Sequence, residues 1–240
     1  VRTLLVTLTL LGSLLVAAAE DRVLSLAQWK AEFQKHDRAL NEVYAALKKE
    51  LPEYRFTAMQ PDQREWVGYR DYIAEGQART TPDDPTQDVA YWEMMAGMTE
   101  GRIDYLKAWK GIGEQGAWTG TYSDGRGGLL EIVQAKEGIY FTCEVVRGTS
   151  FHVGVIGGLA KVNESMARFS VAIEGSNEEC WISFFNDRNE DGRIELMSVN
   201  SHEFHGARAY FDATYLRVGL LDAAAQGRVI KSAKAGGMVE

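Results

Sequence analysis

The sequence pattern best suited to chemistry is a nine-residue acidic loop that runs from Asp187 to Glu195 between two apolar segments. Calcium takes six to eight oxygen ligands, and acidic or amide side chains at positions one, three and five of a tight loop converge on one point. We therefore predict a calcium loop whose ligands are Asp187, Asn189, Asp191, the carbonyl of Arg193, and Glu195. The twelfth position, where an EF-hand supplies glutamate, is Ser198, so the loop fits a variant found between β-strands. The alternative is an ion-free hairpin turn, because Asp, Asn and Gly are also the residues that turns favour.

Motifs for catalysis are absent from the sequence. It has no Gly-x-Ser-x-Gly, phosphate loop, dinucleotide fingerprint or zinc-protease helix motif. His202 and His205 stand three apart on an expected strand, so their side chains would point to opposite faces and could not share a metal. The numerous carboxylates form no pair that can be assigned acid and base roles. We predict a protein that acts by binding and is not an enzyme, with no cofactor other than calcium.

The N-terminal residues have the pattern of a secretory signal. One arginine precedes an apolar run from Leu4 to Ala19 that ends in three alanines, which predicts a signal peptide over 1–19. The run is short for a membrane span, so we expect no stable membrane insertion after cleavage. The alternative is an uncleaved N-terminal anchor. The expected location is the periplasm or the medium outside the cell.

The chain has two cysteines, Cys143 and Cys180, and each lies in phase with apolar neighbours in an alternating pattern. An exported protein meets an oxidising compartment, so an even pair predicts one disulfide. Two buried, reduced thiols on separate strands are the alternative, since cysteine is among the most buried residue types. A nucleophilic thiol needs a nearby base, and the sequence shows no such arrangement.

The formal net charge is −8 at pH 7. Nucleic-acid binding requires a basic face, so this charge argues against a nucleic-acid partner. An acidic surface suits a basic protein partner, although acidity also serves solubility alone.

Apolar residues at helical spacing predict a three-helix domain over 20–112. The first helix carries a stripe that includes Phe33, Leu40 and Leu47; the second follows Pro61 and ends near Gly76; the third runs from Val89 to about Lys110. Polar residues lie among the aromatic ones in the first two helices. Buried polar groups need hydrogen-bond partners, so we expect these residues to clamp the first two helices together: Asn41, Gln63, Arg64 and Arg70.

A glycine-rich joint at 111–116 separates this domain from a second one over 117–218, where the apolar period changes to alternation. Eight short strands with turn residues between them predict an antiparallel, barrel-like β domain. The expected strands are 118–122, 128–134, 138–146, 151–156, 167–173, 180–186, 193–199 and 207–218. The fold class is therefore α+β. Residues 219–240, rich in alanine and glycine, are expected to form a flexible tail.

The helical motifs resemble the LprI-like lysozyme inhibitor family, in which a Leu-Asn-x-x-Tyr helix precedes a Gln-Arg-x-Trp-x-x-Tyr-Arg helix. The residues that match this pattern, whose roles the resemblance implies to be mainly structural, are Leu40, Asn41, Tyr44, Gln63, Arg64, Trp66, Tyr69, Arg70 and, in the closing helix, Arg102. Family members usually carry cysteines that bracket these helices, whereas this chain has none before Cys143. The second domain resembles, more weakly, a β domain that sometimes follows these helices in exported bacterial proteins.

The resemblance implies an exported bacterial inhibitor of animal-type lysozyme, a basic enzyme, that covers the cleft in which the two lysozyme carboxylates act. The alternative function is a periplasmic envelope module that binds a small ligand or a cell-wall fragment.

Overall fold

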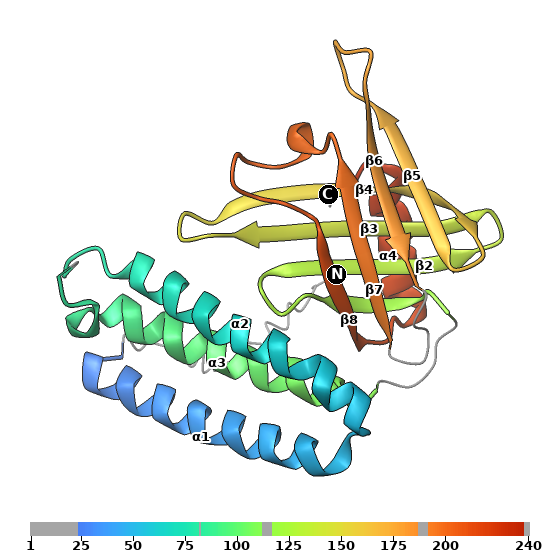
Figure 1. Ribbon diagram of the computed structural model, residues 1–240. Helices are drawn as coiled ribbons and strands as arrows, with labels where there is room; N and C mark the ends of the chain where they lie inside the picture. The colour runs from blue at the N-terminus through green and yellow to red at the C-terminus, as the bar shows by residue number, and fades with distance from the viewer. Residues whose placement is uncertain (1–23, 82, 112–116, 187–191, 238–240) are drawn as a thin grey trace, which may run out of the picture.

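The computed structural model describes residues 24–81, 83–111, 117–186 and 192–237, and its fold class is α+β. Three long helices come first, an eight-stranded antiparallel sheet follows, and one more helix ends the described chain (Figure 1). The predicted fold class is confirmed, but the predicted number of three helices is not, because the structure has a fourth.

The helical part contains α1 (Leu26–Glu50), α2 (Glu53–Gln77) and α3 (Val89–Ala108), with a short 3-10 helix η1 (Pro85–Gln87) before α3. Ser25 and Gln28 form a capping box that starts α1. Asp88 caps α3 by accepting a hydrogen bond from the backbone N–H of Ala90 at 2.9 Å. Along the described stretches of the chain, no helix is both long enough and apolar enough to cross a membrane.

The predicted start of the second helix is wrong. The helix begins at Glu53, directly after Pro52, and Pro61 lies inside it. Proline cannot donate the helical hydrogen bond at its position. The preceding turns nevertheless bury Phe56 and Met59 in the core, and this packing keeps the segment helical.

The predicted hairpin clamp between the first two helices is also wrong, because α3 packs against both α1 and α2 and these two have few direct contacts. One aromatic contact joins α1 to α3, and another is among the few direct contacts between α1 and α2. Phe33 of α1 and Trp92 of α3 have ring centroids 5.5 Å apart, and Tyr44 reaches Phe56 of α2 at 5.4 Å near the other end of α1.

The eight strands pair in chain order, and the last pairs with the first, so the sheet closes into a barrel. They are β1 (Gly120–Ser123), β2 (Gly128–Ala135), β3 (Gly138–Arg147), β4 (His152–Asn163), β5 (Met166–Ala172), β6 (Glu179–Phe185), β7 (Arg193–Val199) and β8 (Ala213–Gly219). Each coincides with a predicted strand, and β7 has the predicted bounds. The last strand starts later than predicted, because residues 207–212 form turns and loop.

The core of the β domain follows the alternation read from the sequence. Inward-facing residues of every strand form one buried cluster, which includes Leu130, Phe141 and Phe184. Gly158 of β4 makes room for this packing, since a Cβ there would lie 2.2 Å from the ring of Phe169.

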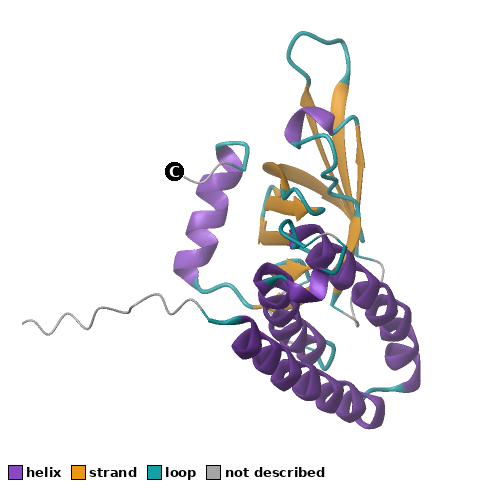
Figure 2. Cartoon of the chain, turned by 90° about the vertical axis from the view of Figure 1, so that its left-hand side faces the viewer, coloured by secondary structure: helices purple, strands orange, loops and turns teal. Residues whose placement is uncertain are grey.

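The segment predicted to be a flexible tail forms α4 (Ala223–Lys234), so that prediction is wrong for these residues. Asp222 caps the helix by accepting from the N–H of Ala225. Ala225, Val229 and Ala233 repeat at every fourth position and pack on the outer face of the sheet, against β2, β3 and β4. Figure 2 shows α4 on a side of the sheet that the other helices do not cover.

The helical part is attached to the β domain by both apolar and polar contacts. Leu216 and Val218 on the outer face of β8 join the helical core beside Leu106 and Trp109. At the end of α2, the Gln77 side-chain amide donates to the carbonyl oxygen of Thr149 at 2.9 Å. The outer face of β8 therefore forms part of the helical core, which is separate from the core inside the barrel.

The predicted disulfide is not formed: Cys143 and Cys180 are both free and fully buried. Cys143 lies on β3 and Cys180 on β6, and two strands, β4 and β5, separate them in the sheet. Each packs among apolar neighbours, so the alternative of two buried thiols on separate strands describes the structure.

Two glycines of α2 differ in their surroundings: Gly68 has free space beside it, whereas Gly76 packs against Thr149 of the β domain. Gly68→Ala is expected to raise the free energy of unfolding by about 0.5–1 kcal/mol, because alanine costs less backbone entropy in a helix and its Cβ would meet nothing within 4 Å. Gly76→Ala is expected to lower it by about 1–3 kcal/mol, because its Cβ would lie 2.1 Å from Thr149 Cγ2. Urea unfolding measures both values. A neutral Gly76→Ala would contradict the close approach of α2 to the β domain.

The two thiols are expected to resist a thiol reagent in the folded protein at about pH 8 and to react in denaturant. Burial raises the pKa of Cys143 to about 12 and that of Cys180 to about 11. The unfolded chain releases these protons near the ordinary pKa of 9.0, so stability should fall as pH rises above that value. A colorimetric count of reactive thiols checks the prediction, and two reactive thiols in the native protein would contradict it.

Candidate functional site

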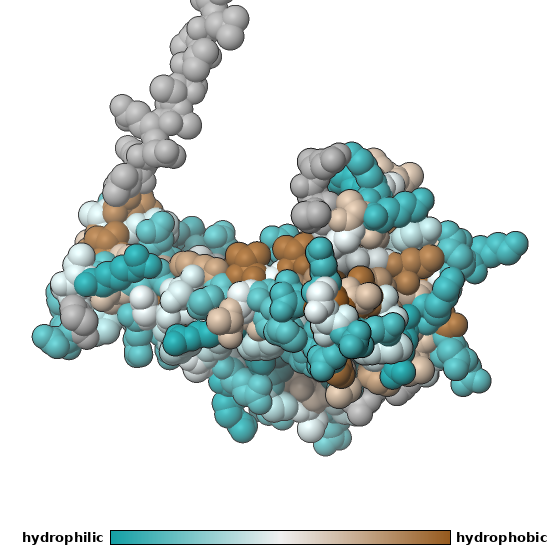
Figure 3. Space-filling model, turned by 90° about the horizontal axis from the view of Figure 1, so that it is seen from above, coloured by the Kyte–Doolittle hydropathy of each residue, from teal (hydrophilic) through white to brown (hydrophobic). Residues whose placement is uncertain are grey.

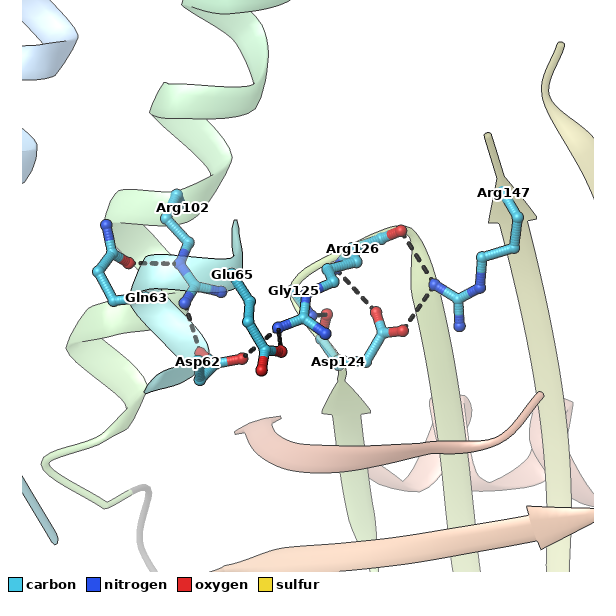
Figure 4. Close-up of polar contacts among 9 residues, drawn as sticks. Asp62, Gln63, Glu65, Arg102, Asp124, Gly125, Arg126 and Arg147 are labelled. Atoms are coloured by element: carbon cyan, nitrogen blue, oxygen red, sulfur yellow. Dashed lines mark hydrogen bonds and ion pairs between the residues drawn. The ribbon is translucent and has the colours of Figure 1, made fainter. Parts of the chain in front are cut away.

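Charged side chains meet where the helical part joins the β domain (Figure 4). Arg102 of α3 has a fully buried side chain, and it donates from Nε to Gln63 Oε1 at 2.8 Å and from Nη2 to Asp62 Oδ2. Asp62 and Gln63 both lie on α2, so this arginine links α3 to α2. A buried guanidinium requires such partners, because an unpaired charge is costly in the interior.

The same carboxylate also reaches the β domain. Arg126, in the turn between β1 and β2, donates from Nη2 to Asp62 Oδ1 at 3.2 Å and to Glu65 Oε2 at 3.0 Å. Asp62 therefore lies between two arginines, one on a helix and one on the barrel. We call Asp62, Arg102 and Arg126 the bridge.

A second ion pair, Arg147–Asp124, lies within the β domain next to the turn that carries Arg126. Arg147 Nη1 is 2.6 Å from Asp124 Oδ2, and the two side chains are 1% and 5% exposed. Asp124 also accepts from the backbone N–H groups of Arg126 and Gly128 at 2.8 and 2.7 Å, which fixes the turn that presents Arg126. Burial by itself lowers the pKa of Arg147, but the Asp124 carboxylate outweighs this effect and holds the pKa above its ordinary value.

Aromatic rings hold the buried arginines from the sides. The Arg102 guanidinium lies 5.2 Å from the ring centroid of Trp66 and 4.3 Å from that of Tyr105. Arg70 lies 5.3 Å from Trp66 and 5.4 Å from Phe33 of α1. Trp66 of α2 therefore contacts an arginine from its own helix and one from α3.

The structure places most motif residues in internal roles. Leu40 and Trp66 are buried, Tyr44 stacks on Phe56, and Gln63 bonds Arg102. The predicted clamp is wrong for Asn41, whose amide donates within α1 to the Asp37 carbonyl at 2.9 Å.

Two arginines of the motif differ from one another. Arg70 donates to its neighbour Asp71 and is buried by Phe33 and Trp66, so stacking and not a hydrogen bond joins it to α1. Arg64 is exposed on α2 and has no internal contact within the described part of the chain.

Two cavities flank the bridge. The first, of about 340 Å³, lies between α2, α3 and the β1–β2 and β3–β4 turns; we call it the interdomain cavity. Its walls are mainly apolar, with Trp66, Ile73 and Met98 among them. The second, of about 280 Å³, is lined by Asp62, Glu65, Asp124 and Asp212 together with Arg126 and Arg193.

The predicted calcium loop is only partly described. Asp187, Asn189 and Asp191 lie outside the described residues, so the prediction stays open. Glu195 is exposed on β7 and pairs with Thr214 of β8, while the Arg193 guanidinium lies 5.4 Å from the Trp109 ring. Within 24–81, 83–111, 117–186 and 192–237, no group of three or more His, Cys, Asp and Glu is placed to hold a metal ion.

The expectation that His202 and His205 lie on one strand is wrong. His202 begins a 3-10 helix, η3 (His202–Phe204), and lies beside Glu203 at the surface. His205 Nε2 is 3.3 Å from Ser201 Oγ, and its Nδ1 is 2.9 Å from the carbonyl oxygen of Gly206.

The sequence reading missed Asp62, Asp124, Arg126 and Arg147 as site residues. Asp124 was visible only as part of a turn, Ser123-Asp124-Gly125, and Asp62 only as the residue after Pro61. Residue types at single positions do not reveal ion pairs that join distant segments. Arg102 and Gln63 were found because they belong to the helical motif.

The comparisons with known proteins bear on the helical part. Residues 17–106 match the family described as "Lysozyme inhibitor LprI". This match confirms the resemblance read from the helical motifs, and the described residues of that range contain α1, α2 and nearly all of α3. No curated protein and no solved structure matches the chain.

The buried pair Arg147–Asp124 can be tested by a double-mutant cycle. Arg147→Met is expected to lower the free energy of unfolding by about 3–5 kcal/mol, because it leaves the Asp124 carboxylate buried without its charge partner. Adding Asp124→Asn should recover part of the loss, since the amide is neutral and its oxygen still accepts from the turn. Denaturant unfolding measures the two single variants and the double variant. A loss in the double variant equal to the sum of the Arg147→Met and Asp124→Asn losses would contradict the coupling.

Proposed function

We propose that the protein is exported and inhibits an animal-type lysozyme by covering its active-site cleft. The match of residues 17–106 to the lysozyme inhibitor family carries this proposal. The charge supports it, because a formal net charge of −8 favours encounter with a basic enzyme.

We assign the contact with lysozyme to the exposed side of α2. Arg64, Gly68 and Tyr72 repeat at every fourth position and so share one face of this helix. Tyr72 is 51% exposed, and a Cβ at Gly68 would meet nothing within 4 Å. The face is therefore a narrow ridge with a polar aromatic side chain at one end and an arginine at the other.

Arg64 has the chemistry for a cleft that contains two carboxylates. A guanidinium forms charge-assisted and often bidentate hydrogen bonds with a carboxylate. Leu40, Trp66, Arg70 and Arg102 are buried in the fold, whereas Arg64 faces solvent. Arg64 is the one residue of this ridge that also belongs to the family motif, and its exposure leaves it free to enter the cleft.

The test is the lysis of a cell-wall suspension by an animal-type lysozyme in the presence of the purified protein, at low and at high salt. We expect dose-dependent inhibition that weakens as salt rises, because salt screens attraction between the acidic protein and the basic enzyme. Gly68→Trp should raise the half-inhibitory concentration at least tenfold, equivalent to about 1.4 kcal/mol, by placing a bulky ring on the ridge.

The matched control is Gly227→Trp. Gly227 is also a helical glycine whose Cβ would meet nothing within 4 Å, but it lies on α4, away from α2 (Figure 1). This variant should inhibit like the unmodified protein. Loss of inhibition in both variants, or in neither, would refute the assignment to α2, and absence of inhibition by the unmodified protein would refute the proposed function.

A further inference from the structure

The interdomain cavity contains a feature that lysozyme inhibition does not explain. Arg102 lines this cavity and uses Nε and Nη2 for Gln63 and Asp62, but its third donor group, Nη1, is buried with no acceptor among the described residues. Arg126 lines the same cavity, and its Nε is likewise buried without an acceptor. A buried donor without a partner is unfavourable, so the two arginines that line this cavity retain unused hydrogen-bonding capacity.

The β1–β2 turn packs closely on Arg102 at one wall of the cavity. A Cβ at Gly125 would come within 2.4 Å of Arg102 Nη1, so glycine permits this close approach. Gly125 has a φ of +70°, a conformation that other residues rarely adopt. At the edge of the cavity Phe151 is 43% exposed and has a φ of +51°, which is unusual for a residue with a side chain.

Among the described residues, acidic side chains line the second cavity but not the interdomain cavity. The charged residues that line the interdomain cavity are both arginines, Arg102 and Arg126, whereas their partners Asp62 and Glu65 line the other cavity. The rest of the interdomain wall is apolar, glycine or aromatic, apart from Ser123. Seen from above, hydrophobic side chains are exposed near the middle of the molecule, between the helical part and the β domain (Figure 3).

We propose that the interdomain cavity binds a small amphipathic carboxylate. The apolar body packs between Trp66, Ile73 and Met98, and the carboxylate pairs with the guanidinium groups of Arg102 and Arg126, the charged residues that line the cavity. A volume of about 340 Å³ lies within the range of small-molecule sites. This site is independent of the exposed side of α2 and does not rest on lysozyme binding.

The test compares three ten-carbon probes that differ in the head group: decanoate, 1-decanol and decyltrimethylammonium. Isothermal titration calorimetry on the unmodified protein should show decanoate binding at least tenfold tighter than decanol, and no binding of the cation. Equal affinity of the three probes would overturn the recognition of a carboxylate. Absence of decanoate binding up to about 1 mM would overturn the site itself.

A variant that fills the cavity locates the binding. Gly101 of α3 lines the cavity and a Cβ there meets nothing within 4 Å, so Gly101→Trp places a ring in the space without a backbone clash. It should weaken decanoate binding at least tenfold, whereas Gly227→Trp on α4 should leave it unchanged. Unchanged binding by Gly101→Trp would overturn the location. The head-group comparison uses the unmodified protein and stands whether or not either variant folds.

Discussion

One carboxylate, Asp62, holds two arginines that come from different parts of the chain, and the joint between helices and barrel depends on it. Arg102 is fully buried, so its charge must be balanced where it lies. Asp62 balances this charge and so holds α2 against α3. The same carboxylate also pairs with Arg126, which holds the β1–β2 turn against the helices. A rotation of the helical part relative to the barrel would therefore separate charges as well as apolar surfaces. The same placement leaves the interdomain cavity with arginines and no acidic residue in the described part of its wall, whereas the second cavity has both.

Much of the architecture could be predicted from local patterns. Alternation of apolar residues located all eight strands, because inward-facing side chains of a closed sheet must be apolar. Helical spacing predicted the apolar stripe of α1 and located α3 to within about two residues at each end. The pattern failed at Pro61, where packing of Phe56 and Met59 outweighs the lost hydrogen bond, and at 223–234, where small alanines gave little sign of a buried face. The small alanine side chains of α4 are buried because the helix lies close to the sheet, and this distance is set by the whole fold and not by the local sequence.

The candidate site was less predictable than the fold for a different reason. Gln63, Trp66 and Arg102 were recognised as a group by their spacing, yet the motif does not state that Arg102 crosses to α2 or that Asp62 shares its charge with a turn 64 residues away. The cysteines illustrate the same limit. Their number and phase are equally compatible with a disulfide and with separate thiols, and only the strand order, which places two strands between them, decides.

The pairing of β8 with β1 has a consequence for how the chain is made. The ring can close only after residue 219 has been synthesised, because the last strand supplies the partner of the first. Until then β1 and β7 are open sheet edges, and the helical part lacks the apolar cover of Leu216 and Val218. A growing or truncated chain thus exposes two strand edges and an apolar helix face together, the combination from which intermolecular aggregation starts. Chaperone protection during synthesis would need to last until β8 is available.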